Sequence, residues 1–438
     1  MSETLVTCAG CGHAVDPALT LPFRCTASQP DDDIDHILTV ASPPSEAWPA
    51  DVNAENPFVR YRRRTLAYRV ARAHGMSDED FVARVTSLDQ SIAAIDGRGF
   101  ARTPLVRAPE ALAGADLWLK VEADNVSGSH KARHLMSVMI YLQVARALEL
   151  PAARGLESRP LAIASCGNAA LGAAVIARAA RWPLDVYIPP DAAPAVVARL
   201  EALDARVHVS PRVDGTPGDP CVHAFRAAVA AGSLPFGVQG NENGLAVEGA
   251  KVLGYELAEQ LAGEGAALEA LFIQVGGGAL GSGCFQALRE AEAAGELTSI
   301  PALYTVQTHG AFPLAEAYAA FADAPGDVSG RRAHAVTHRA DFMRPWPTSP
   351  HSIAHGILDD ETYDWAELVT AMAESGGQAV LATEAQLVDA NERVVELLGL
   401  SVCHTGTAGL AGLMSARAQG IAVPSGGIAV LLTGAMRS

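Results

Sequence analysis

The sequence predicts an α/β protein in which parallel or mixed, twisted sheets are flanked by helices. Short β-rich runs alternate with helical runs from residue 103 onward, a pattern typical of parallel strands covered on both faces. With 438 residues, 49% of them hydrophobic, the chain is long enough for two or three lobes with substantial cores. We expect strands at 161–165, 184–188, 206–209, 270–275, 303–308 and 427–433, and helices at 169–181, 193–203, 244–261 and 281–294.

Three segments follow one another along the chain. Residues 1–42 are polar and turn-rich and resemble a zinc ribbon, and residues 43–100 form a helical arm with helices expected near 61–74 and 78–95. Residues 101–438 carry the predicted strands, which are short apolar runs, and the predicted helices, which are longer and rich in alanine. We expect a smaller lobe, approximately residues 130–235, to be inserted in a larger one.

The N-terminal segment contains candidate zinc ligands. Cys8 and Cys11 lie in a Cys-x-x-Cys-Gly knuckle, and Cys25 follows where a second knuckle is expected. A structural zinc site normally has four ligands, so His13 or one of the carboxylates Asp31–Asp33 would complete it. The alternative is a ribbon that has lost its metal and packs through its apolar residues.

Composition excludes several classes of function. The net charge of −17 argues against nucleic acid as a partner, and we expect the basic run Arg60-Tyr-Arg-Arg-Arg64 to face solvent or an acidic partner surface. No segment has the length of apolar sequence needed to span a membrane, and the N-terminus does not resemble a signal peptide. Seven widely spaced cysteines do not suggest a disulfide framework. We therefore expect a cytoplasmic protein with reduced thiols.

Lys131 is a candidate for covalent chemistry. It lies between a loop of small residues, Asn125-Val-Ser-Gly-Ser-His130, and a strongly apolar helical run at 135–148. A lysine at the start of a buried helix is partly desolvated, and its free amine can then form a Schiff base with a carbonyl group. Many Gly-Ser-x-Lys junctions instead hold a solvent-facing lysine, so the assignment depends on other motifs.

Three predicted strand ends carry further polar or flexible groups, and ligands of open α/β sheets bind beyond such ends. Ser165-Cys166-Gly167-Asn168 opens a helix and forms either an anion site or an ordinary helix cap. The glycine-rich run 276–283 contains the spacing Gly-x-Gly-x-x-Gly, but no carboxylate occurs near 306–308 to bind a ribose, which favours a single phosphate over a dinucleotide. Thr433 ends the last strand as either a core hydroxyl or a ligand group.

Taken together, these motifs resemble the tryptophan synthase β family of pyridoxal phosphate (PLP) enzymes, fold type II, over residues 100–438. Thr103-Pro104-Leu105 and the segment 117–122 resemble the approach to the lysine in that family. Within it, the threonine synthase branch is most similar, because the Cys-x-x-Cys-Gly ribbon, the arm Asn56–Tyr61 and the Leu-Thr-Gly ending have counterparts there. The resemblance implies a two-lobed PLP enzyme and a homodimer.

The resemblance also implies roles for individual residues. Lys131 would hold the cofactor and move the α-proton, and Thr433 would meet the pyridine nitrogen. His130 would lie near the cofactor phosphate, and Asn168 would hydrogen-bond the 3′-oxygen. The backbone N–H groups that bind the phosphate would come from Gly276, Gly277, Gly278, Ala279 and Leu280. The substrate carboxylate would be bound by Ser127, Gly128, Ser129, Ser165, Cys166 and Gly167.

Three functions are consistent with these motifs. The preferred hypothesis is a carbon–oxygen lyase that removes the α-proton of a small L-amino acid, eliminates its β-substituent and releases ammonia and a 2-oxo acid. The first alternative is threonine synthase, which acts on O-phosphohomoserine and needs a second anion site, for which Arg133 and Lys251 are the candidates. The second alternative is a PLP-binding or ligand-sensing protein without turnover.

Overall fold

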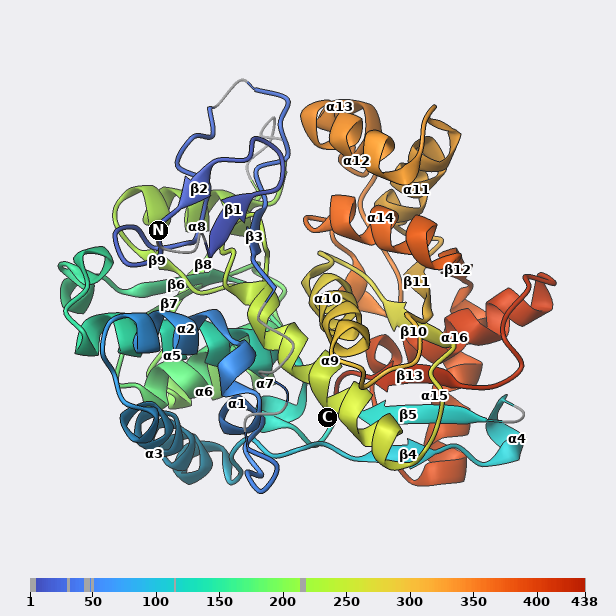
Figure 1. Cartoon of the computed structure of the whole chain (residues 1–438), viewed down its shortest axis with the longest axis horizontal. Coiled ribbons are helices and arrows are strands. Elements are labelled where there is room, and N and C mark those ends of the chain that lie inside the picture. The colour runs from blue at the N-terminus through green and yellow to red at the C-terminus, as the bar shows by residue number, and fades with distance from the viewer. Residues whose placement is uncertain are drawn as a thin grey trace.

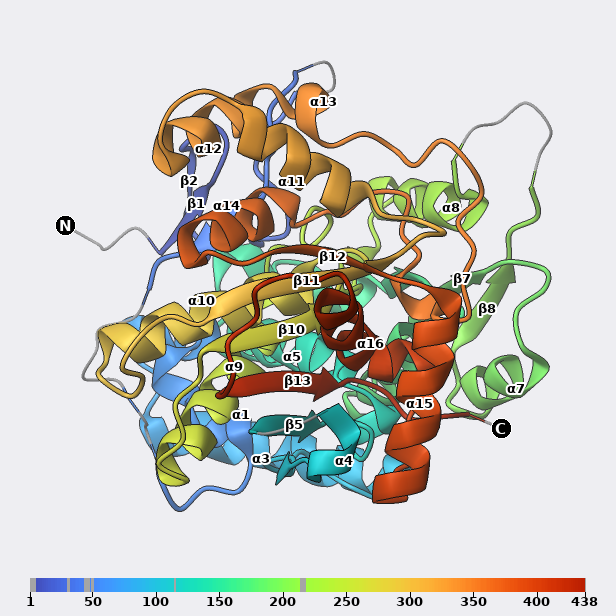
Figure 2. The ribbon, with the colours of Figure 1, turned by 90° about the vertical axis from the view of Figure 1, so that its right-hand side faces the viewer.

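The computed structural model describes residues 5–29, 32–42, 48, 51–113, 116–212 and 218–437, and contains three sheets. The largest has the strand order β12 (Gln378–Ala382), β11 (Ala302–Thr308), β10 (Ala270–Gln274), β13 (Ile428–Leu432), β5 (Leu117–Val121) and β4 (Leu105–Arg107). All neighbours are parallel except β4, which runs antiparallel to β5. Figure 2 shows five of these strands, from β12 to β5, stacked in this order.

The second sheet is fully parallel, with the order β8 (Arg206–Val209), β7 (Leu184–Ile188), β6 (Leu161–Ala164) and β9 (Leu234–Pro235). The third is a small antiparallel sheet, β2 (Ala14–Val15), β1 (Val6–Cys8) and β3 (Leu38–Val40). In Figure 1 the long helix α9 (Ala246–Gly263) runs between the half that holds the second sheet and the half that holds the largest.

The remaining helices cover these sheets. They are α1 (Pro57–Arg60), α2 (Leu66–Ala73), α3 (Asp78–Asp96), α4 (Glu110–Ala113), α5 (Lys131–Ala147), α6 (Asn168–Ala179), α7 (Pro194–Ala202), α8 (Pro220–Ala230), α10 (Ala279–Ala293), α11 (Pro313–Asp323), α12 (Val328–Thr337), α13 (Arg339–Phe342), α14 (Trp365–Ser375), α15 (Glu384–Leu398) and α16 (His404–Ala418). One face of the largest sheet packs against α15 and α16, and the other against α9, α10, α11 and α14. Side chains from the ribbon, the arm, α5 and the second sheet share one core.

The predicted α/β class with mixed and parallel sheets is confirmed, and the predicted strands and most of the predicted helices are present with small shifts at their ends. The helix expected near 61–74 is instead the 3₁₀ turn Arg62–Arg64 followed by the shorter helix α2. In the largest sheet, strands β4, β5 and β12 were not predicted. Strand β5 is buried throughout but contains Lys120. This charged residue interrupts the apolar run from which a buried strand is predicted, so the strand was missed. Tertiary contacts satisfy the charge, because Lys120 Nζ lies 2.5 Å from Glu256 Oε1 and 2.6 Å from the Thr103 carbonyl.

A buried ion network ties α5 to β5 and α9. The Arg133 guanidinium donates to both oxygens of Glu122 at 2.8 Å and to Glu256 at 3.0 Å. Burial by itself would raise the pKa of Glu122, but the charge and hydrogen bonds of Arg133, together with Lys120 and Thr103, outweigh burial and hold that pKa below its ordinary value. The helices approach so closely here that a Cβ at Gly249 would lie 2.2 Å from the Arg133 carbonyl oxygen.

The basic run at residues 60–64 corrects our expectation that it faces solvent or a partner. The side chains of Arg60, Arg62 and Arg64 are buried. Arg60 pairs with Glu259, Arg62 with Asp78 at 2.7 Å, and Arg64 with Glu290 at 3.3 Å. Arg60 and Arg64 tie the arm to α9 and α10, whose carboxylates Glu259 and Glu290 lie about 200 residues away in the sequence. Arg62 pairs within the arm, and Arg63 is the one exposed arginine of the run.

Within the described residues, no single helix is both long and apolar enough to cross a membrane. The helix Lys131–Ala147 and the following segment Pro151–Ser158 together have the length and apolar composition of a membrane span, but they are bent by 106° relative to each other.

Replacing Arg133 with Met is expected to lower the free energy of unfolding by about 3–5 kcal/mol, because two buried carboxylates would lose their partner. The matched control is Arg178→Met, which removes a cation from the exposed pair with Asp204 and should cost less than about 1 kcal/mol. Chemical denaturation of both variants measures the difference. Equal losses would show that the network contributes no more than a surface pair.

Candidate functional site

The sheet order places three functional loops side by side. Strands β10, β13 and β5 are consecutive parallel neighbours, so the segments that follow them leave from the same edge of the sheet. These segments are the glycine loop after Gln274, Thr433 and the turn that leads to Lys131. Asn168 follows β6 of the second sheet and reaches the same region, since its Nδ2 lies 3.0 Å from where a Cβ at Gly434 would be.

Lys131 begins α5 directly after a strained turn. Ser127 and Gly128, in the short 3₁₀ helix Val126–Gly128, both have positive φ angles, 54° and 70°. The Ser127 N–H donates to Asp96 at 2.7 Å, which helps to hold the turn in this conformation. Within the described residues, the Lys131 amine has no hydrogen bond or ion pair. It is half-buried and available for chemistry.

His130 is a neutral residue next to this lysine. Burial, with the neighbouring His134 and Lys131, holds the pKa of His130 well below its ordinary value. Its Nδ1 lies 3.1 Å from the Thr433 carbonyl, which only accepts hydrogen bonds, so Nδ1 carries the proton. The ring thereby ties the start of α5 to the end of β13 without adding a charge.

Asn168 has its orientation fixed by a residue that the motifs did not indicate. Arg437 Nε donates to Asn168 Oδ1 at 2.8 Å, and its Nη2 donates to the Ser127 carbonyl at 2.6 Å. A guanidinium only donates, so the oxygen of the Asn168 amide is occupied and its NH₂ group is left to donate to a ligand. Near the end of the chain, Arg437 thus links α6 to the lysine turn.

Thr433 is also held by a residue that the motifs did not indicate. Gln274 Nε2 donates to Thr433 Oγ1 at 2.7 Å and lies close to three backbone carbonyls, which identifies it as the nitrogen. Because the Thr433 oxygen accepts this bond, its hydroxyl proton is available to donate elsewhere. Gln274 is the last residue of β10, so the same strand holds Thr433 and leads into the glycine loop.

The glycine loop opens α10 with exposed backbone donors. Gly278 has φ 99°, which favours glycine, and no side chain caps the helix. The carbonyls of Gly276 and Gly277 are bonded by Thr362 Oγ1 at 2.9 Å and by the Asp364 N–H at 3.0 Å. The first-turn N–H groups of α10, including those of Ala279 and Leu280, therefore form a ready anion site.

The predicted carboxylate-binding residues come from two loops. The hydroxyls of Ser127 and Ser129 are buried and, in the described part of the chain, have no hydrogen-bond partner. In the other loop, Ser165 Oγ accepts from the Gly167 N–H at 3.4 Å, Cys166 is exposed, and α6 begins without a side-chain cap. Both loops thus present unsatisfied donors.

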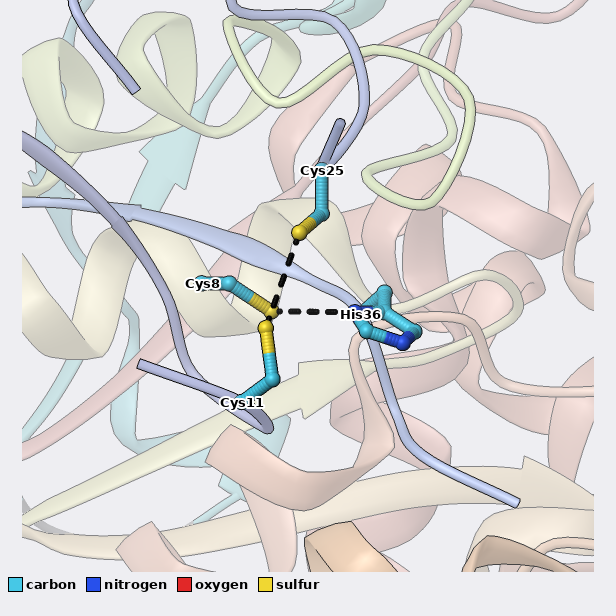
Figure 3. Close-up of side chains that lie close together, drawn as sticks. All are labelled: Cys8, Cys11, Cys25 and His36. Carbon is cyan, nitrogen blue, oxygen red and sulfur yellow. Dashed lines mark hydrogen bonds between the residues drawn. The ribbon is translucent and has the colours of Figure 1, made fainter. Parts of the chain in front are cut away.

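A separate cluster in the ribbon has the geometry of a metal site (Figure 3). The ligand atoms of Cys8, Cys11, Cys25 and His36 all lie within 4.8 Å of one another. The sulfurs of Cys11 and Cys25 are 3.7 Å apart, and two sulfurs at about 2.3 Å from a tetrahedral zinc lie about 3.8 Å apart. His36 Nε2 bonds Asp32 at 2.9 Å, which turns Nδ1 toward Cys8 at 3.4 Å.

The fourth member of this cluster corrects the sequence analysis. His13 Nε2 instead bonds Thr26 Oγ1 at 2.9 Å. Of the suggested carboxylates, Asp32 orients His36, Asp33 accepts from the Ala340 N–H at 2.8 Å, and Asp31 lies outside the described residues. His36 was missed because it lies outside any Cys-x-x-Cys pattern, and pairing of β3 with β1 brings it to the knuckle.

Comparison with known proteins identifies the family. A family model described as pyridoxal-phosphate dependent enzyme matches residues 98–434. The chain belongs to this family. The threonine synthase of Mycobacterium leprae (strain TN) is 27% identical over 318 residues, which cover 72% of this chain and 75% of that protein.

Two solved structures share the fold. Maize serine racemase superposes with a TM-score of 0.60 at 19% identity, covering 81% of this chain and 94% of the racemase. A threonine deaminase from T.th. superposes with a TM-score of 0.59 at 22% identity, covering 82% of this chain and 98% of the deaminase. The resemblance to fold type II PLP enzymes inferred from the motifs is therefore confirmed.

The residues present fit PLP. The uncapped start of α10 suits its phosphate, the free amine of Lys131 suits its aldehyde, and the Thr433 hydroxyl is free to donate to a ring nitrogen. The individual role of each residue stays a prediction. The sequence motifs did not indicate Gln274, which lies in a predicted strand, or Arg437. Only the folded structure shows that Gln274 bonds Thr433 and that Arg437 bonds Asn168.

Arg437→Met is expected to weaken PLP binding about tenfold, because Asn168 would lose the charged donor that fixes its amide. Titrating the apoprotein with PLP and following the visible absorption measures the affinity. Met436→Ala, a change in the neighbouring exposed side chain, is the control and should leave the affinity unchanged. Equal affinities in the wild type and in Arg437→Met would contradict the positioning role.

Proposed function

We propose that this protein is a PLP-dependent carbon–oxygen lyase that eliminates the β-substituent of a small L-amino acid and releases ammonia and a 2-oxo acid. The observation that carries the proposal is the bond from Gln274 to Thr433, which leaves Thr433 as a neutral hydroxyl donor. A neutral partner does not force a proton onto the ring nitrogen, so the cofactor withdraws electrons less strongly. This environment suits elimination better than transamination.

The chain's own residues would divide the remaining work. When bound, PLP supplies an electron sink for the α-carbon. The Lys131 amine takes the α-proton, and its unpartnered state supports this role as a base. Ser127 and Ser129, with the loop 165–167, bind and orient the substrate carboxylate through their free donors. Asn168, whose amide is held by Arg437, would donate to the cofactor's 3′-oxygen.

The basic residues considered for a second anion site favour elimination over the threonine synthase alternative. Arg133 is bound by Glu122 and Glu256, and Lys251 pairs with Glu290 at 2.7 Å and Glu248 at 3.4 Å. All these side chains are buried, so neither cation is free to bind the phosphate of O-phosphohomoserine.

We also propose that Cys8, Cys11, Cys25 and His36 hold a structural zinc ion. The support is the close approach of three sulfurs and one nitrogen, all within 4.8 Å of one another, with Asp32 fixing the histidine tautomer. The ribbon contacts both halves of the molecule, since the Phe23 carbonyl accepts from the Gly244 N–H and the Asp35 N–H donates to the Val336 carbonyl. Zinc would thereby stabilise the packing of the ribbon against the body.

We further propose that the protein acts as a homodimer in the cytoplasm, on a small amino acid and without nucleic acid or a membrane as partner. These proposals are supported by the acidic composition and by the resemblance to threonine synthases. Size-exclusion chromatography with light scattering tests the dimer.

The purified wild type is expected to show the visible absorption band of lysine-bound PLP, and Lys131→Ala is expected to lack it. Particular amino acids should shift the wild-type band, and serine or threonine should yield ammonia. Phosphate release from O-phosphohomoserine would favour threonine synthase instead. Band shifts without turnover of any amino acid would favour a sensing protein, and a wild type that stays colourless with added PLP would overturn the assignment.

Elemental analysis of the purified protein is expected to find about one zinc per chain, as four ligands of this type normally bind one ion. His36→Ala should lose most of this zinc and lower the unfolding temperature, because metal binding contributes to folding. His13→Ala is the matched control and should retain the metal. Loss of zinc in the His13 variant, or its retention in the His36 variant, would refute the ligand set.

A further inference from the structure

The segment that follows β13 pairs with the turn that precedes α5. The Ala435 N–H donates to the Gly128 carbonyl at 2.8 Å, and Gly434 forms an isolated antiparallel bridge with Ser129. These backbone contacts fix the path of the chain as far as Arg437. The side chain of Arg437 is therefore held beside the turn.

The guanidinium of Arg437 connects the two loops that are expected to bind the substrate carboxylate. In the first loop, its Nη2 donates to the Ser127 carbonyl at 2.6 Å. Its Nε donates at 2.8 Å to the amide of Asn168, the residue directly after the second loop, 165–167. The residues predicted to bind the carboxylate in both loops are neutral. Arg437 therefore adds a positive charge where the two loops meet.

This guanidinium keeps unused hydrogen-bond donors. Each of its nitrogens carries N–H groups, and Nε and Nη2 have the partners just described. Within the described residues Nη1 has no partner, and the side chain is exposed. Free N–H groups of a guanidinium bind carboxylate oxygens strongly. Arg437 can therefore keep its present contacts and bind a carboxylate at the same time.

Arg437 also lacks a counter-ion in the part of the chain that the structure describes. Both of its hydrogen-bond partners are neutral oxygens. Asp96 contacts the same turn, but it accepts from the Ser127 N–H at 2.7 Å and lies 3.9 Å from Arg199. A negatively charged ligand would supply the charge that Arg437 lacks.

Other unsatisfied donors of the site lie next to this guanidinium. A Cβ at Gly434 would lie 3.0 Å from Asn168 Nδ2 and 3.7 Å from Ser129 Cβ, so these two side chains are neighbours. The Ser129 hydroxyl is buried and has no hydrogen-bond partner among the described residues. Helix α6, which begins at Asn168, has no side-chain cap. Because Arg437 bonds the same Asn168, the hydroxyl, the helix start and the guanidinium lie in one region.

We propose that Arg437 binds the α-carboxylate of the substrate and thereby selects amino acids whose carboxylate is free. This inference rests on the proposed amino-acid substrate and adds a substrate-binding residue. The free N–H groups of Arg437 donate to the carboxylate, and the Ser129 hydroxyl and the first-turn N–H groups of α6 add neutral donors. Charge-assisted bonds of this kind favour a carboxylate over an uncharged amide. Amino-acid amides and the inner residues of peptides are therefore poor ligands.

The test compares ligands with and without this charge in a protein that cannot turn them over. In the Lys131→Ala background at saturating PLP, the absorption is titrated with L-serine and with L-serinamide, in which a neutral amide replaces the carboxylate. Adding Arg437→Met should weaken serine binding about 10- to 100-fold and serinamide binding less than about threefold. A disturbed Asn168 or PLP would affect both ligands alike, so equal losses, or no loss, would overturn the proposal.

Arg199→Met is the matched control for the loss of a positive charge. Arg199 lies near the same turn through Asp96 and is half-exposed, but it bonds neither loop. Its replacement should change both affinities less than about threefold, because a solvent-exposed charge is largely screened at this range. A loss of serine affinity as large as in Arg437→Met would overturn the direct contact.

The wild type provides a test that does not depend on the folding of a variant. L-Alanine and L-alaninamide have no β-leaving group, so their binding can be followed without elimination. After correction for the fraction of free amine, alanine should bind about tenfold or more tightly than alaninamide. Equal affinities would overturn the proposal.

Kinetics separate this proposal from the lyase function. In Arg437→Met, the KM for L-serine should rise with little change in kcat, whereas a structural defect that displaces Asn168 would lower kcat. A wild type that binds PLP and L-serine but releases no ammonia would overturn the lyase function and leave the role of Arg437 in place. A wild type that binds PLP but no amino acid would overturn both.

Discussion

The buried network of Arg133 with Glu122 and Glu256 is the interaction on which the site depends. Lys131 lies two residues before Arg133, in the first turn of α5, so the ion pairs that hold Arg133 also fix the lysine relative to β5 and α9. A buried charge network is costly unless every member is paired, and here Lys120 and Thr103 complete it.

The topology then brings the other groups to this lysine. Strands β10, β13 and β5 are parallel neighbours, and their ends carry Gln274, Thr433 and the lysine turn. Short polar contacts link these ends, through His130 to the Thr433 carbonyl and through Gln274 to the Thr433 hydroxyl. Both partners are neutral, so these contacts add no charge next to Lys131.

The distribution of charge inside the molecule also limits the choice of substrate. Arg60, Arg62, Arg64, Arg133 and Lys251 are all used in internal pairs between helices or between the arm and the body. Arg133 and Lys251, the candidates for binding the phosphate of O-phosphohomoserine, are therefore not free to bind it. This use of the cations supports a neutral β-substituent.

The sequence by itself determined the α/β class, six of the strands, and the residues whose chemistry is local: Lys131 before a buried helix, the glycine run at 276–278 and the cysteine knuckle. Such features depend on neighbours in the chain, so spacing reveals them. The tertiary structure alone decided that His36 completes the cysteine cluster and that Gln274 and Arg437 orient Thr433 and Asn168. These contacts join residues far apart in sequence, and only strand order and helix packing fix which distant side chains meet.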